Sequence, residues 1–146
     1  MNIIFVVSHM TIFVGGGKFV MEYANKFSEH GHGVTVVAQK IDCSNYKFNS
    51  NVRLIEIGGS LPSSPLFWFS FYSIKKGYVD ALNKLSSDIL LSLNFPVNYF
   101  CANVDKNNHP VYIYYCLEPF RFFHDKEFYS KMPFLKRKST QLLKSL

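Results

Sequence analysis

Five apolar stretches recur along the chain and predict five buried strands. Most of them are runs of β-branched, aliphatic or aromatic residues, which suits strands of a parallel sheet that is covered on both faces. The third stretch alternates apolar and polar residues and predicts a strand nearer an edge. The predicted strands are Ile3–Val7, Val34–Ala38, Val52–Ile57, Asp88–Leu93 and Val111–Cys116.

Helical spacing of apolar residues separates these stretches. Between the first two predicted strands, apolar side chains recur from Phe19 to Phe27, and Gly31 follows where a glycine commonly ends a helix. Ser64 and Pro65 are typical of a helix start, as N-cap and first helical residue. The predicted helices begin near Lys18, at Ser64, at Pro96 and near Phe134, and the second runs to about Leu85.

The alternation of strands and helices predicts the fold class, a Rossmann-like three-layer α/β/α domain with a mainly parallel sheet. A length of 146 residues suits one domain that spans residues 1–146. The gaps between predicted elements are short and we find no internal repeat, which also favours one unit. The chain stops inside the last predicted helix, at Leu146, without a capping signal, and we therefore expect the natural protein to continue.

The charge of the chain favours anionic partners. Lys and Arg number 16 against 10 Asp and Glu, so the net charge is +6. Phosphate groups, an anionic membrane surface and nucleic acid share this attraction. We expect no nucleic-acid partner, because we find no nucleic-acid motif and a group of basic residues lies late in the chain. The group comprises Arg121, Lys126, Lys131, Lys136, Arg137, Lys138 and Lys144.

Cysteine usage and hydropathy predict a cytoplasmic protein. Cys43, Cys101 and Cys116 are far apart and odd in number, which fits reduced thiols better than a disulfide framework. No apolar run approaches the roughly 20 residues of a membrane span, and the N-terminus lacks the basic start of a signal peptide. The inner face of the membrane is a candidate docking surface for such a basic cytoplasmic protein.

The segment from Leu61 to Tyr78 leaves two interpretations open. Its aromatic residues cover too much of a helix circumference for one core face. A helix that is buried all round explains this pattern. A surface that meets a membrane or a lipid tail explains it too, because Lys75 and Lys76 follow at once. The aromatic residues include Phe67, Trp68, Phe69, Phe71 and Tyr72.

Three glycines before the first predicted helix are the first candidates for ligand chemistry. They are Gly15, Gly16 and Gly17, followed by Lys18. Glycine there lets the backbone approach a ligand, and the N–H groups of the helix face an anion. A turn that binds nothing explains the same residues. The pattern matches neither GxGxxG nor a Walker A loop. Because Gln39 stands where a dinucleotide-binding domain would have an acidic residue, an NAD-dependent dehydrogenase is the weaker hypothesis.

Two stretches resemble the N-terminal domain of family 4 glycosyltransferases, which are retaining enzymes of the GT-B fold. The first runs from Ile3 to Gln39: an apolar strand, the glycines, a helix and Gly-His-Gly-Val-Thr-Val-Val at residues 31–37. The second is Tyr-Tyr-Cys-Leu-Glu-Pro-Phe-Arg-Phe-Phe-His-Asp at residues 114–125, similar to a stretch that some members carry after the fifth strand. The order of elements is similar over nearly the whole chain.

The resemblance implies one half of a GT-B enzyme, in which two Rossmann-like domains face each other across a cleft. The chain would be the acceptor-side half, without the C-terminal domain that binds the nucleotide sugar. Gly15, Gly16, Gly17 and Lys18 would form the loop over the donor diphosphate. The resemblance implies no metal and no other cofactor, because helix dipoles and basic side chains offset the diphosphate charge.

Further cleft candidates follow from the resemblance and from their place in the chain. Glu118 and Arg121 follow the fifth predicted strand, where ligands bind in open α/β sheets, and Arg121 suits a phosphate of the acceptor. An ion pair that orders a loop explains both residues equally well. His9 and His124 are further candidates, although a lone histidine is more commonly structural. Leu117 departs from the family stretch, which usually has a histidine able to contact the sugar or the acceptor.

Two function classes stay open. The first is the acceptor-binding half of a glycosyltransferase that moves a sugar from a nucleotide sugar to an acceptor hydroxyl, on a glycan or a lipid-linked acceptor. We expect this chain alone to be inactive. The second is a non-catalytic binding or membrane-recruiting subunit of a split glycosyltransferase, which Leu117 favours. Residue spacing identifies no catalytic nucleophile.

Overall fold

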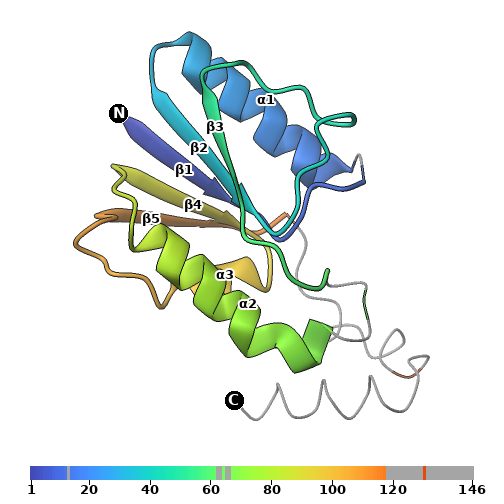
Figure 1. The fold of residues 1–146 in the computed structure, drawn as a ribbon. Helices are drawn as coiled ribbons and strands as arrows, with labels where there is room; N and C mark the ends of the chain where they lie inside the picture. Colours follow the sequence, from blue (N-terminus) through green and yellow to red (C-terminus); the bar gives the residue numbers. More distant parts are fainter. Residues whose placement is uncertain (13, 62–63, 65–66, 118–129, 131–146) are drawn as a thin grey trace.

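A parallel sheet with helices on both faces forms the described part of the chain, residues 1–12, 14–61, 64, 67–117 and 130 of the computed structural model (Figure 1). The strands are β1 (Asn2–Val6), β2 (Gly33–Ala38), β3 (Val52–Glu56), β4 (Ile89–Leu93) and β5 (Val111–Tyr115). The helices are α1 (Gly15–Glu29), α2 (Phe67–Leu82) and α3 (Val97–Cys101). Helix α1 lies on one face of the sheet, and α2 and α3 lie on the other (Figure 1).

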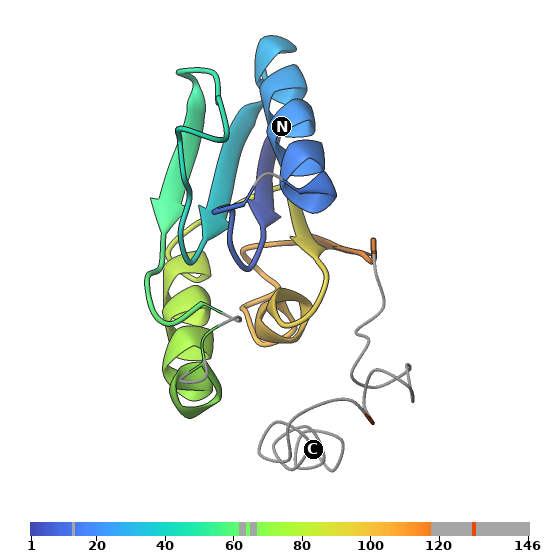
Figure 2. The same ribbon diagram turned by 90° about the vertical axis from the view of Figure 1, so that its right-hand side faces the viewer.

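The strand order is β3-β2-β1-β4-β5, and every neighbouring pair is parallel. The arrows of β1 to β4 point the same way in Figure 2. This architecture confirms the Rossmann-like α/β fold class. All five strands lie where the sequence predicts them, with ends that differ by one residue, which is within the usual scatter of strand boundaries.

The continuous apolar runs reflect burial on both faces of the sheet. In β1, Ile3 and Phe5 pack in the core under α1, whereas Ile4 and Val6 pack in the core under α2 and α3. All four are at most 5 % exposed. Because successive side chains of a strand point to opposite faces, only an unbroken apolar run fills both cores.

Helix α1 differs from the prediction at its start and agrees at its end. It begins at Gly15, so the three glycines form its first turn and not a loop before it. None of these three has a positive φ. Gly31 has a φ of +79°, as expected for the glycine that ends a helix.

Helix α2 is shorter than predicted and is not buried all round. It ends at Leu82, because the N–H groups of Lys84 and Leu85 bond carbonyls only three residues back. Phe67 and Phe71 are buried, whereas Phe69 and Tyr72 are exposed. Pro65 and the predicted helix from Phe134 lie outside the described residues. Within the described residues, no helix is long and apolar enough to span a membrane.

Candidate functional site at the carboxyl edge of the sheet

The centre of the sheet contains a topological switch point. β1 and β4 are neighbours, but the chain leaves β1 toward β2 and leaves β4 toward β5. The loops that follow these two strands therefore diverge at the carboxyl edge. In open α/β sheets this divergence leaves the crevice in which ligands bind. Helices α1 and α3 both begin at this edge.

The first turn of α1 presents backbone amides at the switch point. Val14 is the N-cap residue, its backbone is extended (φ −130°, ψ 164°), and no side chain among the described residues caps the helix. The Lys18 N–H bonds the Val14 carbonyl at 2.9 Å. The glycine N–H groups before it lack such a partner within the helix. Since this turn also contains no acidic residue, the positive end of the helix dipole suits an anion.

The three glycines have different surroundings, which separates their roles. A Cβ on Gly15 would meet nothing within 4 Å. A Cβ on Gly16 would lie 3.4 Å from Cδ1 of Leu117. A Cβ on Gly17 would overlap the phenol of Tyr46, so packing is enough to require a glycine at this position. Gly15 and Gly16 are more accessible than the buried Gly17 and are the first candidates for contact with a ligand.

Tyr46 anchors the loop that leads into α1. Its side chain is 1 % exposed, and its hydroxyl accepts the Val14 N–H at 3.2 Å and donates to the Ile12 carbonyl. These bonds hold the N-cap backbone from a residue that lies after β2. This role of Tyr46 was not predictable from the sequence, because no local pattern around Tyr46 indicates a partner 32 residues away.

The ends of β4 and β5 form the other wall of the site. Asn94 follows β4 with a φ of 59°, and its Oδ1 accepts the Leu117 N–H at 2.9 Å. This bond helps to hold the backbone of Leu117 beside Gly16. Tyr115, the last residue of β5, stacks on Phe19 of α1 with ring centroids 4.8 Å apart. The role of Asn94 was not predicted from the sequence either, although Asn is one of the few residues that readily adopts a positive φ.

His9 and Lys18 lie near this edge, and the side chain of each interacts with a different neighbour. His9 follows β1, and its Nδ1 lies 3.1 Å from the Thr11 hydroxyl. Partial burial lowers the pKa of His9 below its usual 6.5, so the ring tends to stay uncharged. The Lys18 ammonium lies 3.6 Å from a Glu22 carboxylate oxygen, and both side chains are 55 % exposed. Such a pair is weak, which leaves Lys18 available to an anion.

The end of β2 does not provide the acidic residue of a dinucleotide site. Gln39 is buried beneath the loop after β3, where its Nε2 donates to the Ser60 carbonyl at 2.7 Å. Its Oε1 has no hydrogen-bond partner among the described residues. The nearest acidic residue after β2 is Asp42, whose carboxylate accepts bonds from Ser44 and Asn45 in its own turn. These bonds lower the pKa of Asp42.

Three sequence candidates, Glu118, Arg121 and His124, lie outside the described residues. The structure therefore describes only part of the predicted site: it places Leu117 over Gly16 in the first turn of α1, and His9 in the loop after β1. Within the described ranges, no group of three His, Cys, Asp or Glu side chains is placed to hold a metal ion.

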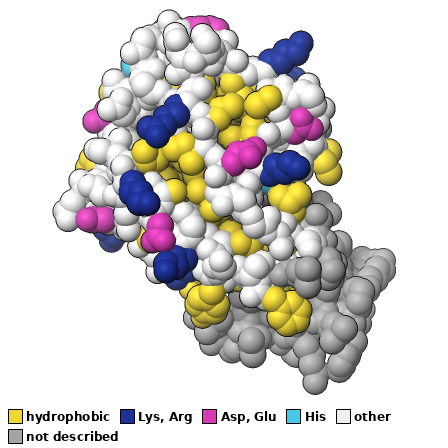
Figure 3. All heavy atoms as spheres, in the orientation of Figure 1, with side chains coloured by type: hydrophobic (Ala, Val, Ile, Leu, Met, Phe, Trp, Pro, Cys, Tyr) yellow, Lys and Arg dark blue, Asp and Glu magenta, His cyan; other side chains and the backbone are white. Residues whose placement is uncertain are grey.

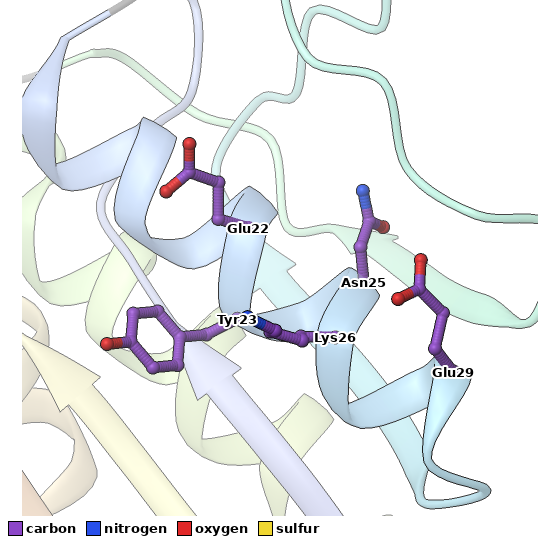
Figure 4. Close-up of a pocket in the computed structure, with 5 residues that line it drawn as sticks. All are labelled: Glu22, Tyr23, Asn25, Lys26 and Glu29. Carbon is purple, nitrogen blue, oxygen red and sulfur yellow. The ribbon is translucent and has the colours of Figure 1, made fainter.

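Two surface hollows lie away from the switch point. One of about 440 Å³ lies on the outer side of α1 and is lined by Glu22, Tyr23, Asn25, Lys26 and Glu29 (Figure 4). In Figure 4 the two carboxylates and the amide point to one side, and the tyrosine ring points to another. Another hollow, of about 390 Å³, lies beside the starts of β1 and β2, at the opposite end of the sheet. Neither hollow is bounded by the first turn of α1.

Comparisons with family models, with curated proteins and with solved structures find no match for this chain. The fold and the site alone therefore define the class of protein. It is a Rossmann-like α/β protein with an uncapped helix N-terminus at the switch point of its sheet.

Proposed function

We propose that the chain is the acceptor-side half of a glycosyltransferase that moves a sugar from a nucleotide sugar to an acceptor hydroxyl. The acceptor is a glycan or a lipid-linked molecule. The observation that carries this proposal is the uncapped first turn of α1 at the switch point. The resemblance of residues 3–39 and 114–125 to family 4 glycosyltransferases supports it.

In this proposal the first turn of α1 stabilises the diphosphate that leaves the sugar. Negative charge grows on that group in the transition state, and fixed N–H donors lower its energy without reorganising. The amides of Gly15 and Gly16 are the donors, because the first N–H groups of a helix lack a partner within it and these two glycines are accessible, whereas Gly17 is buried. Lys18 adds a positive charge at the same turn. Glu118, Arg121, His9 and His124 remain candidates for the acceptor side.

Leu117 gives this site an apolar wall. Its side chain is 41 % exposed and lies over Gly16, so it offers contact area but no hydrogen bond to a sugar. Hydrogen bonds to the transferred sugar must then come from other groups, chiefly from the domain that completes the cleft. We therefore expect the chain alone to bind a nucleotide weakly and to show no turnover.

Backbone NMR of the chain tests the anion site directly. Pyrophosphate, a nucleoside diphosphate and a nucleotide sugar are titrated in turn into labelled protein. The largest amide shifts are expected at Gly15 and Gly16, with smaller ones at Leu117. Shifts confined to other elements would overturn the proposed site. A low micromolar dissociation constant for the nucleoside diphosphate, or measurable sugar transfer by the chain alone, would overturn the proposal that nucleotide binding and catalysis require a second domain.

A pair of valine variants separates ligand contact from folding. Gly16→Val places a branched side chain beside the amides and should weaken diphosphate binding, with a melting temperature close to that of the parent. Tyr23→Val is the control, because it places the same side chain at an exposed position of α1 two turns after Gly16 and leaves the charge unchanged. If Gly16→Val binds as tightly as the parent, the glycines only form a helix start and the proposed donor site is wrong.

A second candidate is a non-catalytic binding subunit of a split glycosyltransferase. Leu117 favours it, because an apolar side chain stands beside the anion site where the family stretch has a histidine. The mass of the natural polypeptide separates the two candidates. A product longer by about one domain, roughly 100–200 residues, supports the single-chain enzyme. A product of this length that co-purifies with a separate nucleotide-sugar-binding chain supports the subunit.

A further inference from the structure

Two aromatic side chains on α2 stand almost entirely in solvent. Phe69 is 89 % exposed and Tyr72 is 72 % exposed, whereas Phe67 and Phe71 of the same helix are buried. Residues 69, 72 and 76 are spaced three and four apart, so they form one stripe along the helix. Figure 3 shows hydrophobic side chains that stand out from the surface along α2, with basic ones beside them. Exposed apolar side chains that gather in this way indicate an interaction surface.

Two lysines accompany the aromatic rings, Lys76 within the stripe and Lys75 beside it on the side of α3. Lys76 continues the stripe one turn after Tyr72, and it is exposed. Lys75 is held in place: its ammonium lies 4.6 Å from the centre of the Tyr99 ring and 3.1 Å from Oδ1 of Asn103. We call Phe69, Tyr72, Lys75, Lys76 and Tyr99 the α2 surface. The first carboxylate of the helix, Asp80, comes one turn beyond Lys76.

We propose that the α2 surface docks on an anionic lipid bilayer. Aromatic rings that protrude from a convex helix face insert into the headgroup region, and lysines beside them meet lipid phosphates and carboxylates. The net charge of +6 adds long-range attraction to the same partner. Docking through this surface does not depend on the proposed sugar transfer.

Charge and area argue against a second copy of the chain as the occupant. A stable interface needs about 800 Å² from each partner, and two protruding rings with their neighbours provide less. A two-fold contact would also bring Lys76 close to its own copy, and like charges repel. The same charges are favourable at an anionic membrane.

Vesicle binding by the whole chain tests the proposal. The probes are vesicles of phosphatidylcholine alone and of phosphatidylcholine with phosphatidylserine. Binding is measured by sedimentation and by the emission of Trp68, the single tryptophan, which precedes Phe69 in α2. We expect binding to the anionic vesicles with a blue shift of this emission, and much weaker binding to the neutral vesicles.

Matched variants locate the contact. Phe69→Ser and Tyr72→Ser should each lower the partition into anionic vesicles, by about tenfold for the phenylalanine. Lys76→Gln should lower it about fivefold, as expected for one basic residue at an anionic surface. Tyr23→Ser is the control, because Tyr23 is 46 % exposed on α1, on the opposite face of the sheet. Circular dichroism checks that each variant is folded.

Three outcomes would overturn the proposal. The first is no binding of the parent chain to anionic vesicles. The second is equal binding by the parent, Phe69→Ser and Tyr72→Ser, which would assign the attraction to basic residues elsewhere. The third is a parent dimer in analytical ultracentrifugation that Phe69→Ser converts to a monomer, which would make the α2 surface an interface between copies.

Discussion

The two ends of the sheet satisfy their polar groups in different ways. At the amino end, His109 is 3 % exposed and both ring nitrogens are engaged: Nδ1 lies 2.8 Å from the Ser87 hydroxyl, and Nε2 donates to the Leu82 carbonyl at 3.1 Å. The Asp88 carboxylate accepts the Asn2 N–H at 2.6 Å. At the carboxyl end, the first turn of α1 has no side-chain cap among the described residues.

This difference separates stability from binding. A buried polar group must find a partner within the protein, so the amino end ties α2, β4 and β5 together. Amides without a partner among the described residues can bond a ligand, and those of the first turn of α1 lie at the carboxyl end. The separation is not complete, because Tyr46 and Gly17 form a packed anchor within the carboxyl end.

The largest effect is expected from His109→Ala. The variant removes two buried hydrogen bonds, leaves the buried Ser87 hydroxyl without its His109 partner, and opens a cavity, whereas the Leu82 carbonyl keeps the Leu85 N–H. We expect a loss of about 3–4 kcal/mol in the free energy of unfolding, measured with urea. His30→Ala is the control, since His30 is exposed and should change stability by less than about 1 kcal/mol. Equal losses in the two variants would show that the amino end is not a stability centre.

The second largest effect is expected from Gly17→Ala, which tests the packed anchor of Tyr46 and Gly17 at the carboxyl end of the sheet. The new Cβ would overlap the Tyr46 ring, which has to move and give up its bonds to the loop before α1. We expect a loss of about 3 kcal/mol, again from urea unfolding. Gly15→Ala should be nearly neutral, because the space around Gly15 is open. A neutral Gly17→Ala would show that Tyr46 accommodates the added methyl group and that packing does not require this glycine.

Asp88→Asn should have a smaller effect on the amino end. The exchange keeps the shape of the side chain and removes the charge that strengthens its bond to the Asn2 N–H. A charge-assisted bond is stronger than a neutral one, and this site is exposed, so we expect a loss of about 1 kcal/mol. The loss is measured by thermal unfolding. The reference variant is Asp80→Asn, which changes an exposed carboxylate on α2. A greater loss in Asp80→Asn would contradict the assignment.

The smallest effect is a pH dependence from His9 at the carboxyl end. Its pKa in the folded protein is lower than 6.5, so the unfolded chain binds a proton more readily. Stability from this residue is present above pH 6.5 and decreases as the pH falls through 6.5 toward the folded pKa. We expect a loss below about 1 kcal/mol, because solvent screens the half-exposed ring. Urea unfolding of the parent and of His9→Asn on both sides of pH 6.5 measures it, and identical pH profiles would refute it.

The strands were predictable because their signal is local. An unbroken apolar run such as Ile3–Val7 has to be buried on both faces, and this requirement alone indicates a central parallel strand. Gly31 was predictable for the same reason, since the end of a helix often needs a positive φ. The start of α1 was not predictable, because three glycines are compatible with both a loop and a first turn.

The candidate site was only partly predictable. The sequence indicated the glycines as a group but not that Gly17 is required by Tyr46, 29 positions later in the chain. It indicated Leu117 as a departure from a family pattern but not that its side chain lies over Gly16. The aromatic segment fitted two interpretations, and only the structure shows which of its rings are buried and that Phe69 and Tyr72 are exposed.

The sequence by itself determined the fold class and the five strands, and it predicts the carboxyl edge as the place for a ligand. Each of these follows from local periodicity and from the rule that parallel strands end at one edge. Only the tertiary structure decided which glycine has open space around it, what holds the loop before α1 and which face of α2 meets solvent. These depend on contacts between residues far apart in the chain, such as Gly16 with Leu117, and no local pattern of residues encodes such a distance.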